Sequence, residues 1–217
     1  MSVEHRVFSD RLLLEIPTKR AAWSDRTVLL MAEMSKLAYY QFETDTAGNV
    51  IPQADLDVVL ERLISSGGEA VSDSPTDAQE ADELPALPED AVRLKDDLVK
   101  AGFELVGLFS HRRTDTQAFL AISTSDSGSD IRPFGDEQVA ILSFRGTKTV
   151  KDWLNNVKFL QKKVEGAAVH RGFQGAFDAL EPAIRKKLDP LVEGGRTLYL
   201  TGHSLGGALA LIAAREI

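Results

Sequence analysis

The sequence contains no cysteine, which excludes disulfide bonds, thiolate metal sites and a cysteine nucleophile. It has no run of about 18 apolar residues, so we expect no membrane-spanning helix. The first residues, MSVEHRVFSDR, lack the apolar stretch of a secretory signal peptide, which favours a cytoplasmic protein. Export by a route without a cleaved signal is the alternative.

Basic residues are in the minority, with 25 Lys and Arg against 33 Asp and Glu. The net charge of −8 argues against a nucleic-acid-binding protein and offers no polybasic patch for an anionic membrane. The remaining composition is ordinary, with 43% apolar and 27% charged residues. A length of 217 residues suits one medium α/β domain with a short extension.

The acidic excess is concentrated in residues 65–90, which contain eight acids and no Lys or Arg. This segment is rich in Ser, Gly and Pro, so it cannot bury enough apolar surface to offset the entropy of ordering. We therefore expect an acidic mobile loop at 65–90, between an N-terminal helical region at 1–64 and a separate region at 91–217. An acidic recognition segment is the less favoured interpretation.

Hydrophobic periodicity predicts a first helix that Ser24 caps, with Trp23 packed onto its first turn. Its apolar residues are Val28, Met31, Met34, Leu37 and Ala38. Further helices are predicted at 54–64, 91–101, 148–160, 171–192 and 205–216. Pro182 and Pro190 lack an N–H group and should kink or divide the helix at 171–192.

Strand-like runs occur at 103–110 and 117–124, which form a predicted hairpin, and at 138–144 and 196–201. The run at 138–144 is almost continuously apolar, as is typical of a central strand buried on both faces.

Residues 202–206 read Gly-His-Ser-Leu-Gly, a G-x-S-x-G motif between a predicted strand and a predicted helix. That context presents a nucleophilic serine on a tight turn. Gly202 and Gly206 keep side chains clear of the neighbouring strand and helix. The helix N-terminus points its N–H groups at Ser204, where negative charge develops. A glycine-rich turn with an incidental serine is the less favoured alternative.

An oxyanion hole needs two N–H donors, one after the nucleophile and one from the loop after another strand. Leu205 supplies the first candidate. Thr147 supplies the second, because it ends the sequence Ser-Phe-Arg-Gly-Thr that closes the strand at 138–144. The alternative is an ordinary strand-to-helix turn with Thr147 as the N-cap.

Four segments, in order, resemble the class 3 (fungal-type) lipase family of α/β-hydrolases. They are MAEMSKLAYYQF (31–42), AILSFRGTKTVKDWLNNVKF (140–159), VHRGFQGAFDAL (169–180) and LYLTGHSLGGALALIAA (198–214). The resemblance implies a mixed sheet with flanking helices, Ser204 as the nucleophile, and the N–H groups of Thr147 and Leu205 as the oxyanion hole.

The resemblance also implies a lid after Thr147. Its apolar stripe, which could face lipid when the lid opens, consists of Val150, Trp153, Leu154 and Val157. A helix packed permanently on the core is an equally weighted alternative.

In α/β-hydrolases the acid and then the histidine follow the serine along the chain. The residues after Ser204 include Glu216 and no histidine, and Glu216 lies on the helix that leads away from the serine. The resemblance therefore implies the N-terminal part of a hydrolase domain, truncated after the nucleophile helix. The catalytic Asp and His are expected beyond residue 217.

The histidines that precede Ser204 are not favoured as its base. His203 adjoins the serine and cannot easily take its proton. His170 matches a family position upstream of the nucleophile, and we expect a structural or hydrogen-bonding role. His5 and His111 are expected at the surface.

These features predict a serine ester hydrolase that acts on triacylglycerol or other carboxylic ester lipids through an acyl-enzyme on Ser204. The chemistry needs no metal or cofactor. The implied partners are an ester substrate and a transient lipid interface. The rival from another class is a catalytically inactive fragment or interaction module, and an acyltransferase or phospholipase is a further alternative.

Overall fold

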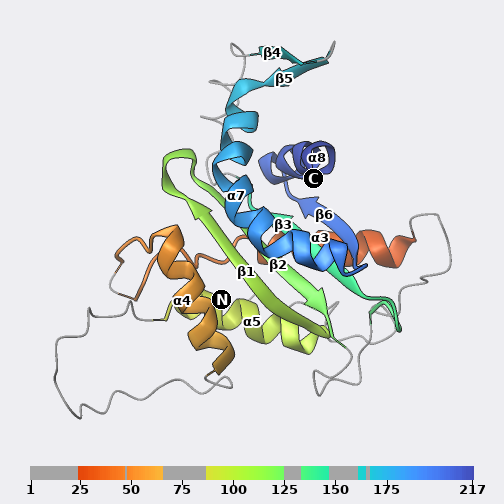
Figure 1. Cartoon of the computed structure of the whole chain (residues 1–217). Coiled ribbons are helices and arrows are strands. Elements are labelled where there is room, and N and C mark those ends of the chain that lie inside the picture. Colours follow the sequence, from red (N-terminus) through yellow and green to blue (C-terminus); the bar gives the residue numbers. More distant parts are fainter. Residues whose placement is uncertain (1–23, 47, 66–86, 125–132, 147–160, 165–166) are drawn as a thin grey trace.

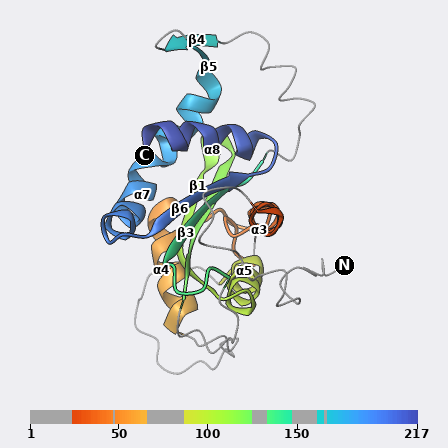
Figure 2. The same cartoon turned by 90° about the vertical axis from the view of Figure 1, so that its right-hand side faces the viewer.

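A mixed, four-stranded β-sheet forms the centre of the computed structural model, with helices on both faces (Figures 1 and 2). The structure describes residues 24–46, 48–65, 87–124, 133–146, 161–164 and 167–217, with side chains for all of these except 161–171. The strands, in their order across the sheet, are β1 (Phe103–His111), β2 (Thr116–Ser123), β3 (Val139–Phe144) and β6 (Thr197–Gly202). The β1–β2 and β2–β3 pairs are antiparallel and the β3–β6 pair is parallel. The expected α/β class with a mixed sheet and flanking helices is confirmed.

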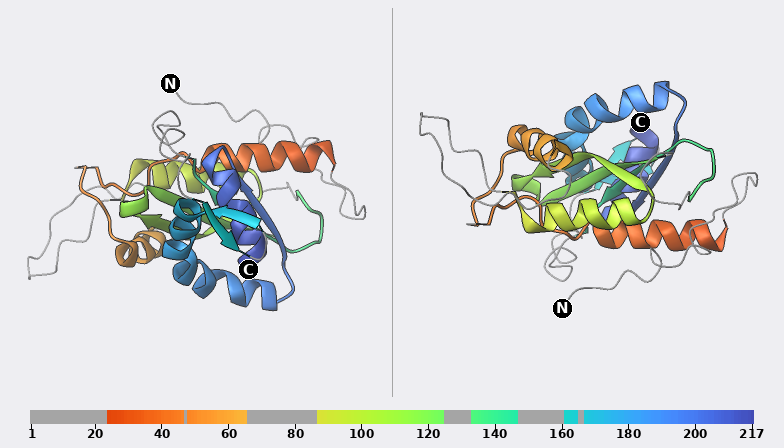
Figure 3. Two further views of the ribbon diagram at one scale, coloured as in Figure 1. Left: turned by 90° about the horizontal axis from the view of Figure 1, so that it is seen from above. Right: turned by 90° about the horizontal axis from the view of Figure 1, so that it is seen from below.

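Two groups of helices cover the two faces of the sheet. The first group is α3 (Asp25–Leu37) and α5 (Glu89–Lys100), whose core also includes residues of α4 (Gln53–Ser65) beside the edge strand β1. The second is α7 (Arg171–Glu193) and α8 (Leu205–Glu216). Figure 3 shows α3 and α5 on one side of the strands and α7 and α8 on the other. The helices of the predicted N-terminal region therefore share one core with the sheet.

Alternation along β3 shows how the sheet divides the core. Val139 and Ile141 join the core under α3 to α5, whereas Ala140 and Leu142 join the core under α7 and α8. This alternation follows from the two-residue period of a strand. All six residues of β3 are buried, which confirms the predicted central strand.

The first helix begins as predicted, since Ser24 Oγ accepts a hydrogen bond from the Thr27 N–H at 3.1 Å. Met31, Met34, Leu37 and Ala38 are buried, as expected. Val28 is 52% exposed, so its assignment to the apolar stripe was wrong. Leu30, on the same face as Met34 and Leu37, takes a core position in its place. Trp23 lies outside the described residues.

The long helix α7 keeps its hydrogen-bonded course past both prolines, which were expected to kink or divide it. The helix is not divided, but Figure 1 shows that it changes direction along its length. Pro182 and Pro190 are both exposed, so the carbonyls that they cannot bond face solvent. The opposite face packs into the core through Phe177, Leu180, Ile184 and Leu188.

The remaining elements are short. A 3₁₀ turn, η1 (Arg112–Thr114), closes the predicted β1–β2 hairpin. A second hairpin, β4 (Gln161–Val164) with β5 (Ala167–His170), was not predicted. The helix predicted at 148–160 lies outside the described residues. Of the predicted acidic loop, Ser65 belongs to α4 and Glu89 and Asp90 to α5, and 66–86 lie outside the described residues.

Within the described residues, none of the helices combines the length and the apolar character needed to cross a bilayer.

We expect Phe177→Ala to lower the free energy of unfolding by about 3 to 5 kcal/mol, because it empties a fully buried ring position. The ring of Phe177 packs against that of Phe144, with centroids 6.3 Å apart, so the lost contacts include the end of β3. Chemical denaturation monitored by circular dichroism measures the change. As a control, Val192→Ala on the same helix, 40% exposed, should change stability by less than about 0.5 kcal/mol.

Candidate active site

Ser204 lies on the tight turn between β6 and α8, in a backbone conformation that non-glycine residues rarely adopt. Its φ is 56° and its ψ is −117°. Among the described non-glycine residues, only Asp115 shares a positive φ. Such strain persists only where the surrounding structure imposes it, and it is typical of functional sites. The serine residue is exposed.

The glycines on each side of Ser204 permit a very close approach of backbones. A Cβ atom on Gly202 would collide with the backbone of Gly206, and a Cβ atom on Gly206 would collide with the carbonyl oxygen of Phe144. The first turn of α8 therefore rests directly on the ends of β6 and β3. Both glycines therefore leave the space that we predicted from the sequence. Any side chain at either position would push α8 away from the sheet.

The parallel pairing of β3 and β6 brings the two predicted halves of the site together. Phe144 and Gly202 are partners in the register, so both strands end at the same level. Gly146 follows β3 and lies against the turn, since a Cβ there would be 2.5 Å from the His203 carbonyl oxygen. Leu205 directly follows Ser204 at the start of α8. The Thr147 position lies outside the described residues, as does the predicted lid stripe of Val150, Trp153, Leu154 and Val157.

Two strand hydroxyls fix helix α3 beside this edge. Ser143 Oγ donates to the Met34 carbonyl at 3.0 Å, and Thr201 Oγ1 donates to the Met31 carbonyl at 2.9 Å. Ser143 and Thr201 are themselves partners in the β3–β6 register. Their two acceptors lie three residues apart, nearly one turn of helix. Each hydroxyl stands three residues before Gly146 or Ser204, so α3 is held in register with both loops of the site.

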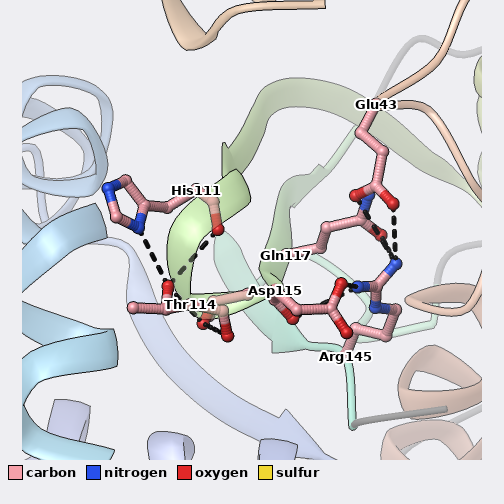
Figure 4. Close-up of polar contacts among 7 residues, drawn as sticks. Glu43, His111, Thr114, Asp115, Gln117 and Arg145 are labelled. Atoms are coloured by element: carbon pink, nitrogen blue, oxygen red, sulfur yellow. Dashed lines mark hydrogen bonds and ion pairs between the residues drawn. The ribbon is translucent and has the colours of Figure 1, made fainter. Parts of the chain in front are cut away.

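A buried arginine closes β3 immediately before Gly146 (Figure 4). The Arg145 side chain is fully buried and pairs with Glu43 at 3.2 Å and Asp115 at 2.5 Å. It also donates to Gln117 Oε1 at 2.5 Å and to the Asp115 carbonyl at 3.2 Å. Its backbone N–H donates to the Gln117 carbonyl at 2.9 Å. The end of β3 is thereby tied to the β1–β2 turn and to the segment after α3.

This arginine network was missed at the level of sequence. Arg145 was part of the quoted Ser-Phe-Arg-Gly-Thr run, but its partners lie 30 and 102 residues away in the chain. The signal that could have found it was a lone cation at the end of an apolar strand. Such a charge must be paired if the strand is buried.

The two histidines whose side chains are described contact residues other than Ser204. His203 Nδ1 lies 2.9 Å from the Tyr39 hydroxyl. His111, which was expected at the surface, is partly exposed, and its Nδ1 lies 2.9 Å from Thr114 Oγ1. His111 ends β1, which is three strand spacings, about 14 Å, from β6, so its side chain is far from Ser204. His5 and the side chain of His170 lie outside the described residues.

Glu216 cannot act on Ser204. It stands at the far end of α8, about 16 Å along the helix from Leu205. The side-chain bond to Arg215 lowers the pKa of Glu216. The described residues include no cluster of three or more His, Cys, Asp or Glu side chains able to hold a metal ion.

Comparison with known proteins finds similarity to one family in the C-terminal part of the chain. The model of class 3 lipases matches residues 141–217. The C-terminal part of the chain is therefore similar to class 3 lipases. It contains the β3 end, the β4–β5 hairpin, α7, the Ser204 turn and α8.

Individual proteins that resemble this part of the chain are also lipases. A secreted mono- and diacylglycerol lipase of Fusarium solani is 37% identical over 79 residues, which are 34% of this chain and 24% of the relative. A secreted mono- and diacylglycerol lipase of Penicillium camembertii is 27% identical over 109 residues, 48% of this chain and 32% of the relative. The matched part of the chain thus spans about a quarter to a third of these curated relatives.

A solved structure of a triacylglycerol lipase with a serine protease triad at its catalytic centre superposes on the chain with a TM-score of 0.47. The sequence identity is 16%, and the match covers 91% of this chain and 57% of that structure.

We expect Gly206→Ala to lower the free energy of unfolding by about 2 to 3 kcal/mol or more, because the added methyl group overlaps the Phe144 carbonyl. Gly175→Ala is the matched control. Gly175 lies in α7 with no atom within 4 Å of an added Cβ. The higher helix propensity of alanine should therefore stabilise the protein by up to about 1 kcal/mol. Chemical denaturation compares the two. Equal stability for both variants would contradict the close packing of α8 on β3.

We expect Arg145→Met to destabilise the fold by about 3 kcal/mol, because Glu43 and Gln117 lose their partner in a buried position. Arg93→Met is the control, since Arg93 pairs with Glu89 and Asp90 at the surface and is 61% exposed. Its loss should cost less than about 1 kcal/mol. Denaturation midpoints of the two variants, measured in parallel, show whether the burial of Arg145 explains its larger contribution to stability.

Proposed function

We propose that the protein is a serine ester hydrolase that cleaves lipid or other carboxylic esters, with Ser204 as its nucleophile. The observation that carries the proposal is the turn at Ser204. A serine with φ 56° stands between a parallel strand and a helix whose first turn rests on Gly202, inside a segment that matches class 3 lipases. This is the strand–turn–helix setting that raises a nucleophilic serine above an α/β sheet.

The reaction would proceed through an acyl-enzyme. Ser204 Oγ attacks the ester carbonyl carbon while a base takes its proton, and the C–O bond to the alcohol breaks as the alcohol receives that proton. Water then attacks the acyl-serine and releases the carboxylic acid. The N–H groups of Leu205 and Thr147 would stabilise the oxyanion, which is where preorganised donors contribute most.

The base and its orienting acid are assigned by the chain order of the family, in which an Asp or Glu and then a His follow the serine. Both would lie after residue 217, because residues 205–217 contain no histidine and their one acid, Glu216, stands at the far end of α8. The stripe of Val150, Trp153, Leu154 and Val157 would serve as a lid that meets a lipid interface.

Two other functions remain rivals. The inactive fragment or interaction module is favoured by the absence of a base beside Ser204 within the described residues. An acyltransferase or phospholipase would share the acyl-enzyme and differ in the acceptor or in the bond cleaved. Analysis of the products formed from a lipid ester in the presence of alcohol distinguishes these from a hydrolase.

Labelling of Ser204 tests the proposal. We expect a fluorophosphonate to modify one serine in the chain extended past residue 217, because such probes react with activated serines. Ser204→Ala should abolish the labelling, and Ser110→Ala on β1 should leave it unchanged. A folded protein that never labels at Ser204 would overturn the proposed function.

The inactive-fragment interpretation is tested by an assay with a short p-nitrophenyl ester. Residues 1–217 and the extended chain are assayed in parallel. Turnover that disappears in Ser204→Ala would exclude the inactive-fragment interpretation. A loss of about 10⁴-fold or more relative to the extended chain is expected, since oxyanion-hole and binding effects alone would remain.

A further inference from the structure

Tyr39 reaches the Ser204 turn from a distant part of the chain. It follows α3, and its N–H donates to the Lys36 carbonyl at 3.0 Å, so the first residues after the helix remain tightly wound. The hydroxyls of Ser143 and Thr201 fix α3 to the two strands that end at the site. The position of Tyr39 over the turn is therefore set by the sheet itself.

The hydroxyl of Tyr39 meets both loops of the site at once. Tyr39 Oη lies 2.9 Å from His203 Nδ1, and the two rings pack edge to face with centroids 5.8 Å apart. On the other side, a Cβ added to Gly146 would lie 2.5 Å from the same hydroxyl and 3.4 Å from Ser204 Cβ. The hydroxyl thus sits where the turn before α8 faces the loop after β3.

The next residue in the chain shows that this placement is specific. Tyr40 points elsewhere, and its hydroxyl donates to Asp97 Oδ2 on α5 at 2.8 Å. Two consecutive tyrosines therefore serve different parts of the molecule. One braces α5 against α3, and the other contacts the Ser204 turn.

The Tyr39 phenol remains protonated under ordinary conditions. Burial raises the pKa of Tyr39, and the nearby positive charge of Arg145 opposes this rise only in part. The neutral O–H group can donate to His203 Nδ1 or accept from an Nδ1–H, depending on the imidazole tautomer. In both arrangements the contact joins the residue before Ser204 to helix α3.

We propose that Tyr39 is a positioning residue for the Ser204 site, whose hydroxyl fixes His203 and the spacing between the Ser204 turn and the backbone at Gly146. The proposal rests on the proposed function, because the two oxyanion donors, Leu205 and Thr147, belong to these two loops. Donors of this kind work only when held within about 0.5 Å of the productive geometry. A tyrosine that spans both loops supplies that restraint.

Removal of the Tyr39 hydroxyl tests the role. In the same protein used for Ser204 labelling, we expect Tyr39→Phe to lower the maximal rate of fluorophosphonate labelling by about tenfold. The probe concentration that gives half-maximal rate should stay the same, because the lost restraint acts in the transition state. Tyr40→Phe is the matched control and should label at the wild-type rate.

A double-mutant cycle separates positioning from a general loss of structure. His203→Phe keeps a ring and removes Nδ1, so it should also slow labelling about tenfold. In that background, Tyr39→Phe should add less than about a twofold further loss. Denaturation midpoints of Tyr39→Phe and Tyr40→Phe should match each other.

The outcomes distinguish this proposal from the proposed function. A wild-type protein that never labels at Ser204 overturns both. Wild-type labelling with an unaffected Tyr39→Phe variant overturns only the role of Tyr39. Independent losses that multiply in the double variant also overturn it, since they show that the hydroxyl does not act through His203. If Tyr39→Phe fails to fold, wild-type labelling rates in His203→Phe overturn the role.

Discussion

The contact between the first turn of α8 and the end of β3 is the constraint on which the rest of the site depends. Gly206 leaves no room for a Cβ atom against the Phe144 carbonyl, and Gly202 leaves none against Gly206. With α8 this close to the sheet, the chain has only the short turn at 203–204 in which to reverse, and Ser204 takes a positive φ. The strain at the serine is thus a consequence of packing, maintained by the buried face of α8.

That contact also explains why polar groups gather around a largely apolar sheet edge. The strands must end at one level for α8 to rest on both, and the β3–β6 register provides this. Ser143 and Thr201 then use their hydroxyls to hold α3, while the buried Arg145 ties the next residues of the chain to Glu43 and Asp115. The buried side chains of Ser143 and Arg145 each bond to groups that hold a neighbouring segment in place. The burial of these hydrogen-bonded groups makes the sheet edge at the ends of β3 and β6 rigid.

The sequence predicted the features that depend on local pattern, and it failed where distant residues meet. The limits of α8, the buried β3 strand and the glycines around Ser204 follow from periodicity and from the needs of a tight turn. The partners of Arg145 and the contact of Tyr39 with His203, 164 residues away, depend on how α3 crosses the sheet, which no local pattern encodes. The β4–β5 hairpin was missed because its short strands carry little hydrophobic alternation.

The family match begins at residue 141, but the structural unit that supports Ser204 begins much earlier. The carbonyls of Met31 and Met34 accept hydrogen bonds from the hydroxyls on the two strands of the site. Tyr39 contacts the Ser204 turn, and Glu43 forms an ion pair with Arg145. These four residues lie within a stretch of 13 in the sequence. A chain reduced to residues 141–217 would expose the hydroxyls, the arginine and one whole face of β3 to solvent. The N-terminal segment is therefore part of the machinery that shapes the serine turn, and the resemblance of residues 31–42 to the same family has a physical reason.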